Sequence, residues 1–144
     1  MTIKTDHPQD VSTPELLFHL LGAAHSLSDQ VDKALSPLGL SPAALHLLST
    51  LVTASEPPEA RALAPKVGGL ASATELLLDR LEQDGLVRRT SGGGGRPVRV
   101  VITARGRAQH GAALERLSAL RLALAQAFGG TDTAAAERAL AALR

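Results

Sequence analysis

The sequence lacks several kinds of residue, and each absence excludes a class of chemistry. None of its 144 residues is cysteine, which excludes disulfide bonds, thiolate metal sites and thiol redox sensing within this chain. Tryptophan and tyrosine are also absent, so the usual stacking partners for an aromatic ligand are missing. Phe18 and Phe128 are the two aromatic residues, which leaves most of the packing to alanine and leucine.

Long apolar runs are missing as well. No run approaches the roughly 20 residues that a helix needs to span a bilayer, and the N-terminal MTIKTDHPQDVS lacks the apolar stretch of a secretion signal. We therefore expect a soluble, unprocessed, cytoplasmic protein with no membrane partner. The length suits one domain with a real core, or a small core with an extended dimerisation part.

The residue patterns of common enzyme sites are also missing. The sequence has no Ser/His/acid order, no supported pair of carboxylates and no GxxxxGK[ST] phosphate loop. The glycine run 92–95 does not stand in the strand-loop-helix context that a phosphate loop needs. We expect neither enzymatic activity nor a cofactor.

The net charge is small, but the charged residues are unevenly distributed along the chain. The net charge of +1 is small for a nucleic-acid-binding protein. Between Arg80 and Arg107, however, seven arginines stand against two acidic residues, which gives this segment +5 and the remainder −4. An arginine-rich stretch is usually a solvated surface, but one that follows a helix-turn-helix pattern indicates contact with phosphates.

That pattern lies in the middle of the chain. A short helical segment over 60–67, a Gly-Gly turn at 68–69 and a second helix over 73–84 precede two β-like runs, over 86–90 and 98–103. This is the order of elements in a winged helix-turn-helix.

Local signals mark the boundaries of these elements. Ser72 and Glu75 have the spacing of a capping box, which predicts the start of the second helix, and Gly85 predicts its end. The second β-like run alternates, with one face formed by Val98, Val100 and Ile102.

Four further helices are expected on either side of this unit. Helical periodicity and start signals predict helices from Thr13 to about Ser36, from Ser41 to about Thr53, from Ala104 to about Phe128, and over 133–143. Thr103 is the expected N-cap of the third of these helices.

The first and last helices carry apolar stripes that the small winged unit cannot cover. Such a stripe usually belongs to the core of its own chain, but the two ends of this sequence leave more apolar surface than one small core accommodates. We therefore expect a homodimer. The candidate interface residues are Leu17, Leu20, Leu124, Phe128, Leu140 and Leu143.

Four segments resemble the motifs of one family. They are Leu78–Glu82 (LDRLE), Gly85–Arg89 (GLVRR), the wing-tip Arg96 and Ile102–Gly106 (ITARG). This sequence resembles the MarR family of dimeric winged helix-turn-helix transcription regulators, most closely within residues 63–106.

The resemblance implies a mainly α fold with a small β-hairpin wing (α+β). It implies one domain over residues 1–144, with a winged helix-turn-helix over 41–103 and dimerisation helices over 12–36 and 104–144. It also implies a homodimeric, sequence-specific regulator that binds double-stranded DNA at a pseudopalindromic operator, and more specifically a repressor that a small ligand releases.

The start of a recognition helix reads bases in the major groove, and a wing arginine enters the minor groove. The candidate DNA contacts are Ser72, Thr74, Arg88, Arg96, Arg99 and Lys66. Arg88 and Arg89 point to opposite faces of a strand, so one of them is expected to meet phosphate. Asp79 is expected to hold a nearby arginine, and Glu75 to serve as the capping-box acid.

Three departures from the family pattern leave an alternative open. Glu75 and Leu76 stand where relatives usually have threonine and arginine, and Gly94 replaces the acidic residue that braces the wing arginine. The alternative is a dimeric ligand-binding or interaction protein with degenerate DNA binding.

The histidines suggest an effector site. His25, His46 and His110 fall on three different helices and form no His-x3-His pair, so we expect no metal site. A pocket for a small organic anion, with His25 and His46 as candidate contacts, is the better interpretation. A metal-responsive regulator is the lesser alternative.

Overall fold

The computed structural model describes residues 13–127, 129 and 133–142. This part of the chain is mostly helical with a two-stranded antiparallel hairpin, as expected. The order of elements is α1 (Thr13–Leu35), η1 (Ser36–Leu38), α2 (Pro42–Thr53), η2 (Ala60–Ala62), α3 (Leu63–Val67), α4 (Ala71–Gln83), β1 (Val87–Arg89), η3 (Gly93–Gly95), β2 (Val100–Ile102), α5 (Ala104–Arg116), α6 (Ser118–Ala127) and α7 (Thr133–Ala141).

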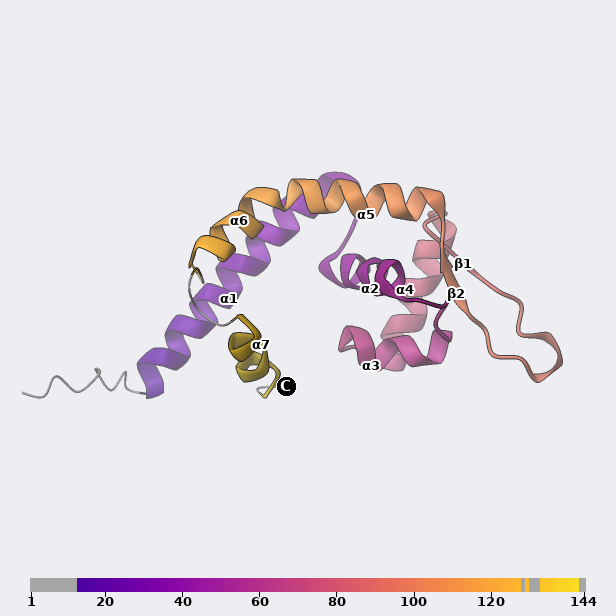
Figure 1. Ribbon diagram of the computed structural model, residues 1–144, viewed down its shortest axis with the longest axis horizontal. Helices are drawn as coiled ribbons and strands as arrows, with labels where there is room; N and C mark the ends of the chain where they lie inside the picture. Colours follow the sequence, from indigo (N-terminus) through magenta and orange to yellow (C-terminus); the bar gives the residue numbers. More distant parts are fainter. Residues whose placement is uncertain (1–12, 128, 130–132, 143–144) are drawn as a thin grey trace, which may run out of the picture.

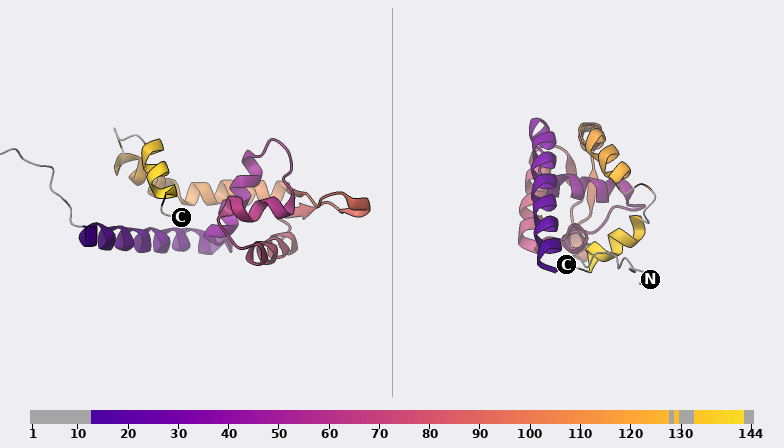
Figure 2. Two further views of the ribbon diagram at one scale, coloured as in Figure 1. Left: turned by 90° about the horizontal axis from the view of Figure 1, so that it is seen from below. Right: turned by 90° about the vertical axis from the view of Figure 1, so that its left-hand side faces the viewer.

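The molecule is elongated, with two unlike ends. Helices α2, α3 and α4 and the β-hairpin form a unit at one end, and the hairpin loop projects beyond it (Figure 1). The N-terminal part of α1, together with α6 and α7, forms the other end, and α5 connects the two (Figures 1 and 2).

Local capping signals predicted three helix boundaries correctly. The Ser41 hydroxyl accepts a hydrogen bond from the Ala44 N–H at 3.1 Å and caps α2. The Thr103 hydroxyl likewise accepts from the Gly106 N–H at 3.0 Å and caps α5. Gly85, with φ of +73°, follows the C-cap of α4.

The start of α4 differs from the prediction. The helix begins at Ala71 rather than Ala73, and its N-cap is Leu70, which makes no side-chain capping bond. The Thr74 N–H already donates to the Leu70 carbonyl at 2.9 Å, so helical hydrogen bonding begins earlier than predicted. Ser72 therefore lies inside the first turn, and the predicted capping box with Glu75 is wrong.

The long C-terminal helix is bent into two. Leu117 (φ −90°, ψ 0°) separates α5 from α6, where the sequence predicted one helix from Ala104 to Phe128. The Leu117 N–H donates to Ala113 and the Arg121 N–H to Leu117, so hydrogen bonds continue through the bend. Leu117 is buried in the core, whereas none of the residues of α6 is buried. Phe128 and Leu143 lie outside the described residues.

The strands are shorter than predicted but keep the predicted alternation. Val87 pairs with Ile102, Arg88 with Val101 and Arg89 with Val100. Val100 and Ile102 are buried, whereas Val98 lies beyond the paired strand and is exposed.

The core lies in the winged unit. Its most deeply buried side chains come from α1, α2, α3, α4 and both strands: Leu35, Leu47, Leu48, Leu63, Leu78, Leu81, Val87 and Val100. Arg116 Nε donates to the Ala34 carbonyl at 2.6 Å and holds the end of α5 against the end of α1.

The N-terminal part of α1 is exposed to solvent in the described part of the chain. Every residue over 14–30 is exposed, and Phe18 is 70% exposed. The large exposed apolar side chains of the terminal helices are Leu16, Leu17, Phe18, Leu20, Leu21, Leu27, Leu122, Leu124 and Leu140.

Among the described helices, none is by itself both long and apolar enough to cross a membrane. The segments Pro14–Leu38 and Pro42–Thr53 meet that test only together, as a pair bent by 75°.

Candidate nucleic-acid interface

Helix α4 presents one face to the core and the opposite face to solvent. The core face carries the buried side chains of Thr74, Leu78 and Leu81. At 100° per residue, the opposite face is formed by four exposed residues: Ser72, Leu76, Asp79 and Gln83. This outer face is the surface that a recognition helix would present to DNA.

The structure contradicts the prediction that Thr74 contacts DNA. Thr74 is only 4% exposed, and its hydroxyl donates to the Leu70 carbonyl at 3.0 Å. A Cβ at Gly69 would lie 3.3 Å from that hydroxyl, so the turn packs closely over it. Ser72, in contrast, is exposed in the first turn, so it remains a candidate contact.

The corrected helix start gives a stability prediction. Because Ser72 does not cap α4, Ser72→Ala should change the free energy of unfolding by less than about 0.5 kcal/mol. Thr103→Ala removes a real cap and should cost about 1 kcal/mol. Urea unfolding of both variants measures the difference. Equal losses for the two would show that Ser72 has a structural role after all.

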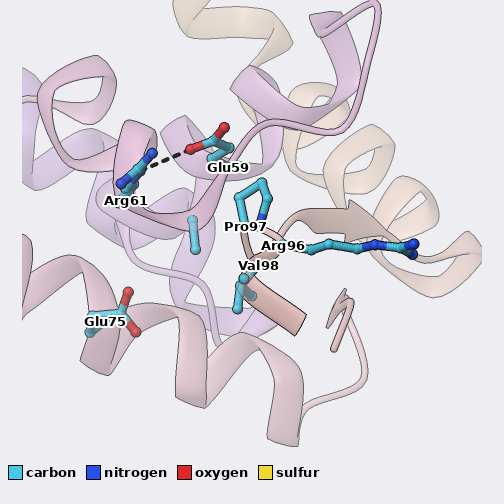
Figure 3. Close-up of a pocket in the computed structure, with 8 residues that line it drawn as sticks. Glu59, Arg61, Glu75, Arg96, Pro97 and Val98 are labelled. Atoms are coloured by element: carbon cyan, nitrogen blue, oxygen red, sulfur yellow. Dashed lines mark hydrogen bonds and ion pairs between the residues drawn. The ribbon is translucent and has the colours of Figure 1, made fainter. Parts of the chain in front are cut away.

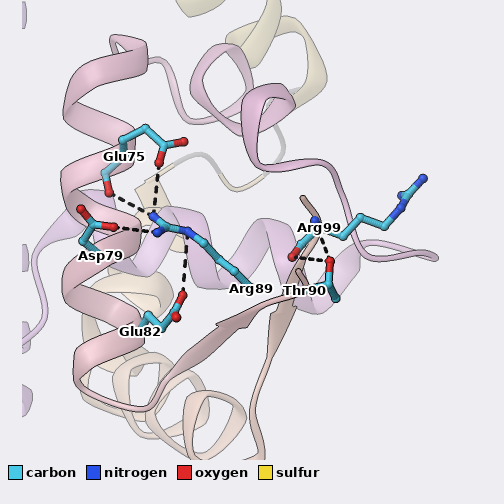
Figure 4. A network of polar contacts seen from close by, with 6 residues as sticks. All are labelled: Glu75, Asp79, Glu82, Arg89, Thr90 and Arg99. Atoms are coloured by element: carbon cyan, nitrogen blue, oxygen red, sulfur yellow. Dashed lines mark hydrogen bonds and ion pairs between the residues drawn. The ribbon is translucent and has the colours of Figure 1, made fainter. Parts of the chain in front are cut away.

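Arg89 is the best-connected charged residue of the site. Its Nη1 lies 2.7 Å from Asp79 Oδ1, its Nη2 lies 3.3 Å from both Glu75 Oε2 and the Glu75 carbonyl, and its Nε lies 3.8 Å from Glu82 Oε2. Figure 4 shows the guanidinium crossing from the hairpin to α4. The arginine thus joins β1 to α4.

This arrangement confirms one expected role and revises another. Asp79 does hold an arginine, as predicted, and that arginine is Arg89. Glu75 is structural too, but as a partner of Arg89 rather than as a capping acid. The sequence signal for the cluster was available, because Glu75, Asp79 and Glu82 are spaced four and three residues apart on one helix face.

Arg88 points away from this cluster. It is exposed, whereas the Arg89 side chain is 23% exposed. Because adjacent strand residues face opposite sides, Arg88 can reach an external phosphate while Arg89 cannot without breaking its ion pairs.

The wing loop depends on glycine at particular positions. Gly94 and Gly95 have φ values of +72° and +77°, in the left-handed region. A Cβ at Gly92 would lie 2.8 Å from the Arg96 carbonyl and 2.9 Å from Val98 Cγ2, so the loop closes only with glycine there.

Arg96 follows these glycines and is exposed. Figure 3 shows its side chain extending away from Glu75 and Arg61. A groove of about 550 Å³ lies between the wing and α4, lined by Glu59, Ala60, Arg61, Glu75, Gly95, Arg96, Pro97 and Val98. The ion pair between Arg61 Nε and Glu59 Oε2, at 2.9 Å, borders it.

The remaining predicted cations have different surroundings. Arg99 is half-buried and its Nη1 donates to the Pro57 carbonyl at 2.7 Å, so it braces the base of the wing. Its backbone N–H also donates to the Thr90 hydroxyl oxygen at 3.0 Å (Figure 4). Lys66 is exposed in the last turn of α3.

The three histidines considered as candidate ligands, His25, His46 and His110, have separate surroundings. His25 Nε2 lies 3.7 Å from Asp29 Oδ2, and both side chains are exposed. His46 is exposed on α2, and His110 Nε2 lies 2.9 Å from Ser49 Oγ. The described residues contain no group of three or more His, Cys, Asp or Glu side chains placed to hold a metal ion.

The sequence did not predict a second groove that the structure contains. Neither His25 nor His46 lines it. It measures about 590 Å³ and lies between the end of α1, the start of α2 and helix α4. Its lining residues are Asp32, Ser36, Gly39, Leu40, Ser41, Ala44, Leu76, Leu77, Arg80, Leu81 and Asp84. These residues are distant in sequence, so their proximity follows only from the tertiary fold.

Comparison with models of protein families gave no match, and comparison with curated protein sequences gave none either. Solved structures, however, are similar over nearly the whole chain. A MarR-family transcriptional regulator from Rhodococcus sp. RHA1 is 26% identical, with 93% of each chain covered and a TM-score of 0.69.

Two further relatives were solved with ligands. The M. tuberculosis regulator MosR, in complex with DNA, is 26% identical over 88% of this chain and 91% of that chain, with a TM-score of 0.71. CouR from Rhodococcus jostii RHA1, bound to p-coumaroyl-CoA, is 27% identical over 94% and 92%, with a TM-score of 0.68. These neighbours are described as transcriptional regulators, not enzymes. By its fold and these similarities, the chain resembles the winged-helix transcriptional regulators of the MarR family.

Proposed function

We propose that this protein is a homodimeric transcription regulator that binds double-stranded DNA. The observation that carries the proposal is the common location of the outer face of α4 and two exposed hairpin arginines, Arg88 and Arg96, at one end of the molecule. In this arrangement α4 enters the major groove and Arg96 enters the adjacent minor groove. The similarity to MosR, which was solved in complex with DNA, supports this mode of binding.

The terminal helices support the proposed dimer. Exposed leucines on α1, α6 and α7 form more apolar surface than a monomer in water normally leaves uncovered. Leu17, Leu20, Leu124 and Leu140 are exposed members of this surface. A second copy of the chain would cover it, and a twofold dimer would bind a pseudopalindromic site with two α4 helices.

A repressor released by a small ligand is the regulatory form that we favour. CouR, which is 27% identical, was solved with p-coumaroyl-CoA, an organic thioester that carries anionic phosphates. By analogy we propose a small organic anion as effector. His25 and His46 are exposed on α1 and α2 and stay our candidate contacts for it.

The acidic residues of α4 favour a second candidate function. Glu75, Asp79 and Glu82 share a single arginine, Arg89, which leaves this cluster with a net charge of −2 beside the proposed DNA surface. Such a charge repels phosphates. An interaction or ligand-binding protein with degenerate DNA binding is therefore the alternative.

Arg96→Ala separates the two functions. The variant removes one cation per subunit, so the log-log slope of affinity against salt should become shallower by up to about 0.9 per lost phosphate contact, or about two per dimer. Stability should change by less than about 0.5 kcal/mol, because Arg96 is exposed. Fluorescence-anisotropy titrations at several salt concentrations measure the slope.

The matched control is Lys33→Ala, which removes the same charge from an exposed position on α1. It should leave the salt slope nearly unchanged. If Arg96→Ala and Lys33→Ala both have the same salt slope as the unmodified protein, the wing does not contact DNA. The alternative function is then favoured.

A further inference from the structure

Two exposed leucines at the start of α4 are not explained by the proposed dimer. Leu70 is 76% exposed and Leu76 is 71% exposed. The other large exposed apolar side chains of the described chain lie on α1, α6 and α7, apart from Val98 in the wing. Leu70 and Leu76 are therefore exposed apolar side chains on the helix-turn-helix, apart from those of the terminal helices.

The position of Leu76 on α4 is well defined. It lies four residues after Ser72, on the face opposite Thr74 and Leu78, which are buried in the core. Leu76 is thus near the middle of the outer face and in the N-terminal half of the helix. In a recognition helix, this half contacts base edges.

The same part of α4 lacks the side chains that form bidentate hydrogen bonds with bases. Residues 71–79 (ASATELLLD) contain no arginine, lysine, asparagine or glutamine, which are the usual partners of guanine and adenine. Ser72 is the exposed hydroxyl donor there, since the Thr74 hydroxyl is bonded to Leu70. The base-edge group that a leucine can contact favourably is the 5-methyl group of thymine.

Ion pairs hold acidic side chains near Leu76, and exposed arginines lie on the adjoining hairpin. Arg89 holds the Glu75 and Asp79 carboxylates by ion pairs, and Arg80 Nε lies 3.9 Å from Asp84 Oδ2. The exposed arginines Arg88 and Arg96 project from the adjoining hairpin. Attraction to the phosphates therefore comes from the wing, which leaves the leucine face of α4 for apolar contact.

We propose that Leu76 is a specificity-determining residue that contacts thymine 5-methyl groups in the major groove, and that each half-site carries thymine where the start of α4 lies. The inference rests on the proposed DNA-binding function and names the base chemistry that this function uses.

Uracil substitution tests the inference directly. Deoxyuridine keeps the Watson-Crick hydrogen bonds of thymidine and lacks only the 5-methyl group. The probe is the tightest-binding duplex selected from genomic fragments by the purified full-length protein, with thymines replaced by uracil at symmetric positions of the two half-sites. Loss of one contacted methyl should weaken binding about fourfold, and loss of one in each half-site about 15-fold.

Two variants assign the effect to Leu76. Leu76→Ala should bind the thymine duplex about as weakly as the unmodified protein binds the uracil duplex, and it should no longer distinguish the two duplexes. Leu76→Met keeps an apolar side chain of similar volume and should keep most of the discrimination. Arg96→Ala should bind both duplexes more weakly but with an unchanged ratio, because the 5-methyl group lies in the major groove. Leu76 is exposed, so melting curves should confirm that each variant is folded.

The possible failures are distinct. If no duplex is selected, the proposed function is wrong and this inference falls with it. If DNA binds but uracil has no effect at any position, or if Leu76→Ala still discriminates, DNA binding stands and the role of Leu76 is refuted.

Discussion

Replacement of Leu17 by glutamate should convert the proposed dimer into monomers. Leu17 is 52% exposed within its own chain, and every described neighbour along α1 over 14–30 is exposed too. Full burial of a leucine side chain contributes about 1.5–3 kcal/mol to the free energy of association. A twofold interface contains two copies of Leu17, so the contribution is doubled. The dimer should therefore weaken by about 3–6 kcal/mol, which is two to four orders of magnitude in dissociation constant.

Size-exclusion chromatography with light scattering measures the change. His19→Glu is the matched control, because residues 17 and 19 lie on nearly opposite sides of a helix and His19 is also exposed. The control should remain dimeric at concentrations where Leu17→Glu is monomeric. The monomer should also lose helical circular dichroism, since an isolated helix of this length is marginal in water. If the Leu17→Glu variant still has the mass of a dimer, α1 is not part of the interface.

Replacement of Arg89 by alanine should produce the largest stability loss among the arginines of the hairpin. The guanidinium is mostly buried and contacts Asp79 at 2.7 Å and Glu75 at 3.3 Å, so alanine leaves carboxylates of α4 close together without their cation. Hydrogen bonds to charged groups contribute about 1.5–3 kcal/mol, and partial exposure of the acids reduces this, so we expect a loss of about 2 kcal/mol. Denaturant unfolding measures it.

Arg88→Ala is the internal control for this experiment. Its side chain is exposed on the other face of the same strand, so its stability loss should stay below about 0.5 kcal/mol. Arg89→Lys should lie between the two, because lysine keeps the charge but cannot present two parallel donors. Part of the difference should vanish at high salt, where ion pairs are screened. Equal stabilities of the two alanine variants would mean that the Arg89 cluster does not hold the wing to α4.

Features set by neighbouring residues were predictable from the sequence. Ser41 and Thr103 cap helices, and Gly85 ends α4, because each of these signals depends on backbone groups at most a few residues away. Ser72 shows the limit of this approach. Its spacing to Glu75 is that of a capping box, but the helix starts two residues earlier, at Ala71, where the Thr74 N–H donates to the Leu70 carbonyl.

Features that depend on distant residues were beyond the sequence interpretation. The bend at Leu117 interrupts an apolar periodicity that continues without a break, and it arises where α5 leaves the core. The contacts of Arg89 join residues up to 14 positions apart, so the carboxylates could be seen to share a face while their cation could not be identified. Arg99 was predicted to contact phosphate, but its Nη1 donates a hydrogen bond to the Pro57 carbonyl, 42 residues away in the sequence.

The central claim is that the exposed end of the winged unit binds a symmetric DNA site. A binding selection from random genomic fragments with the purified full-length protein tests it most directly. We predict enriched fragments that share an inverted repeat with half-sites about 10 base pairs apart, centre to centre, or a multiple of that spacing. Enrichment of no common sequence, with binding that is weak and uniform across fragments, would contradict the claim.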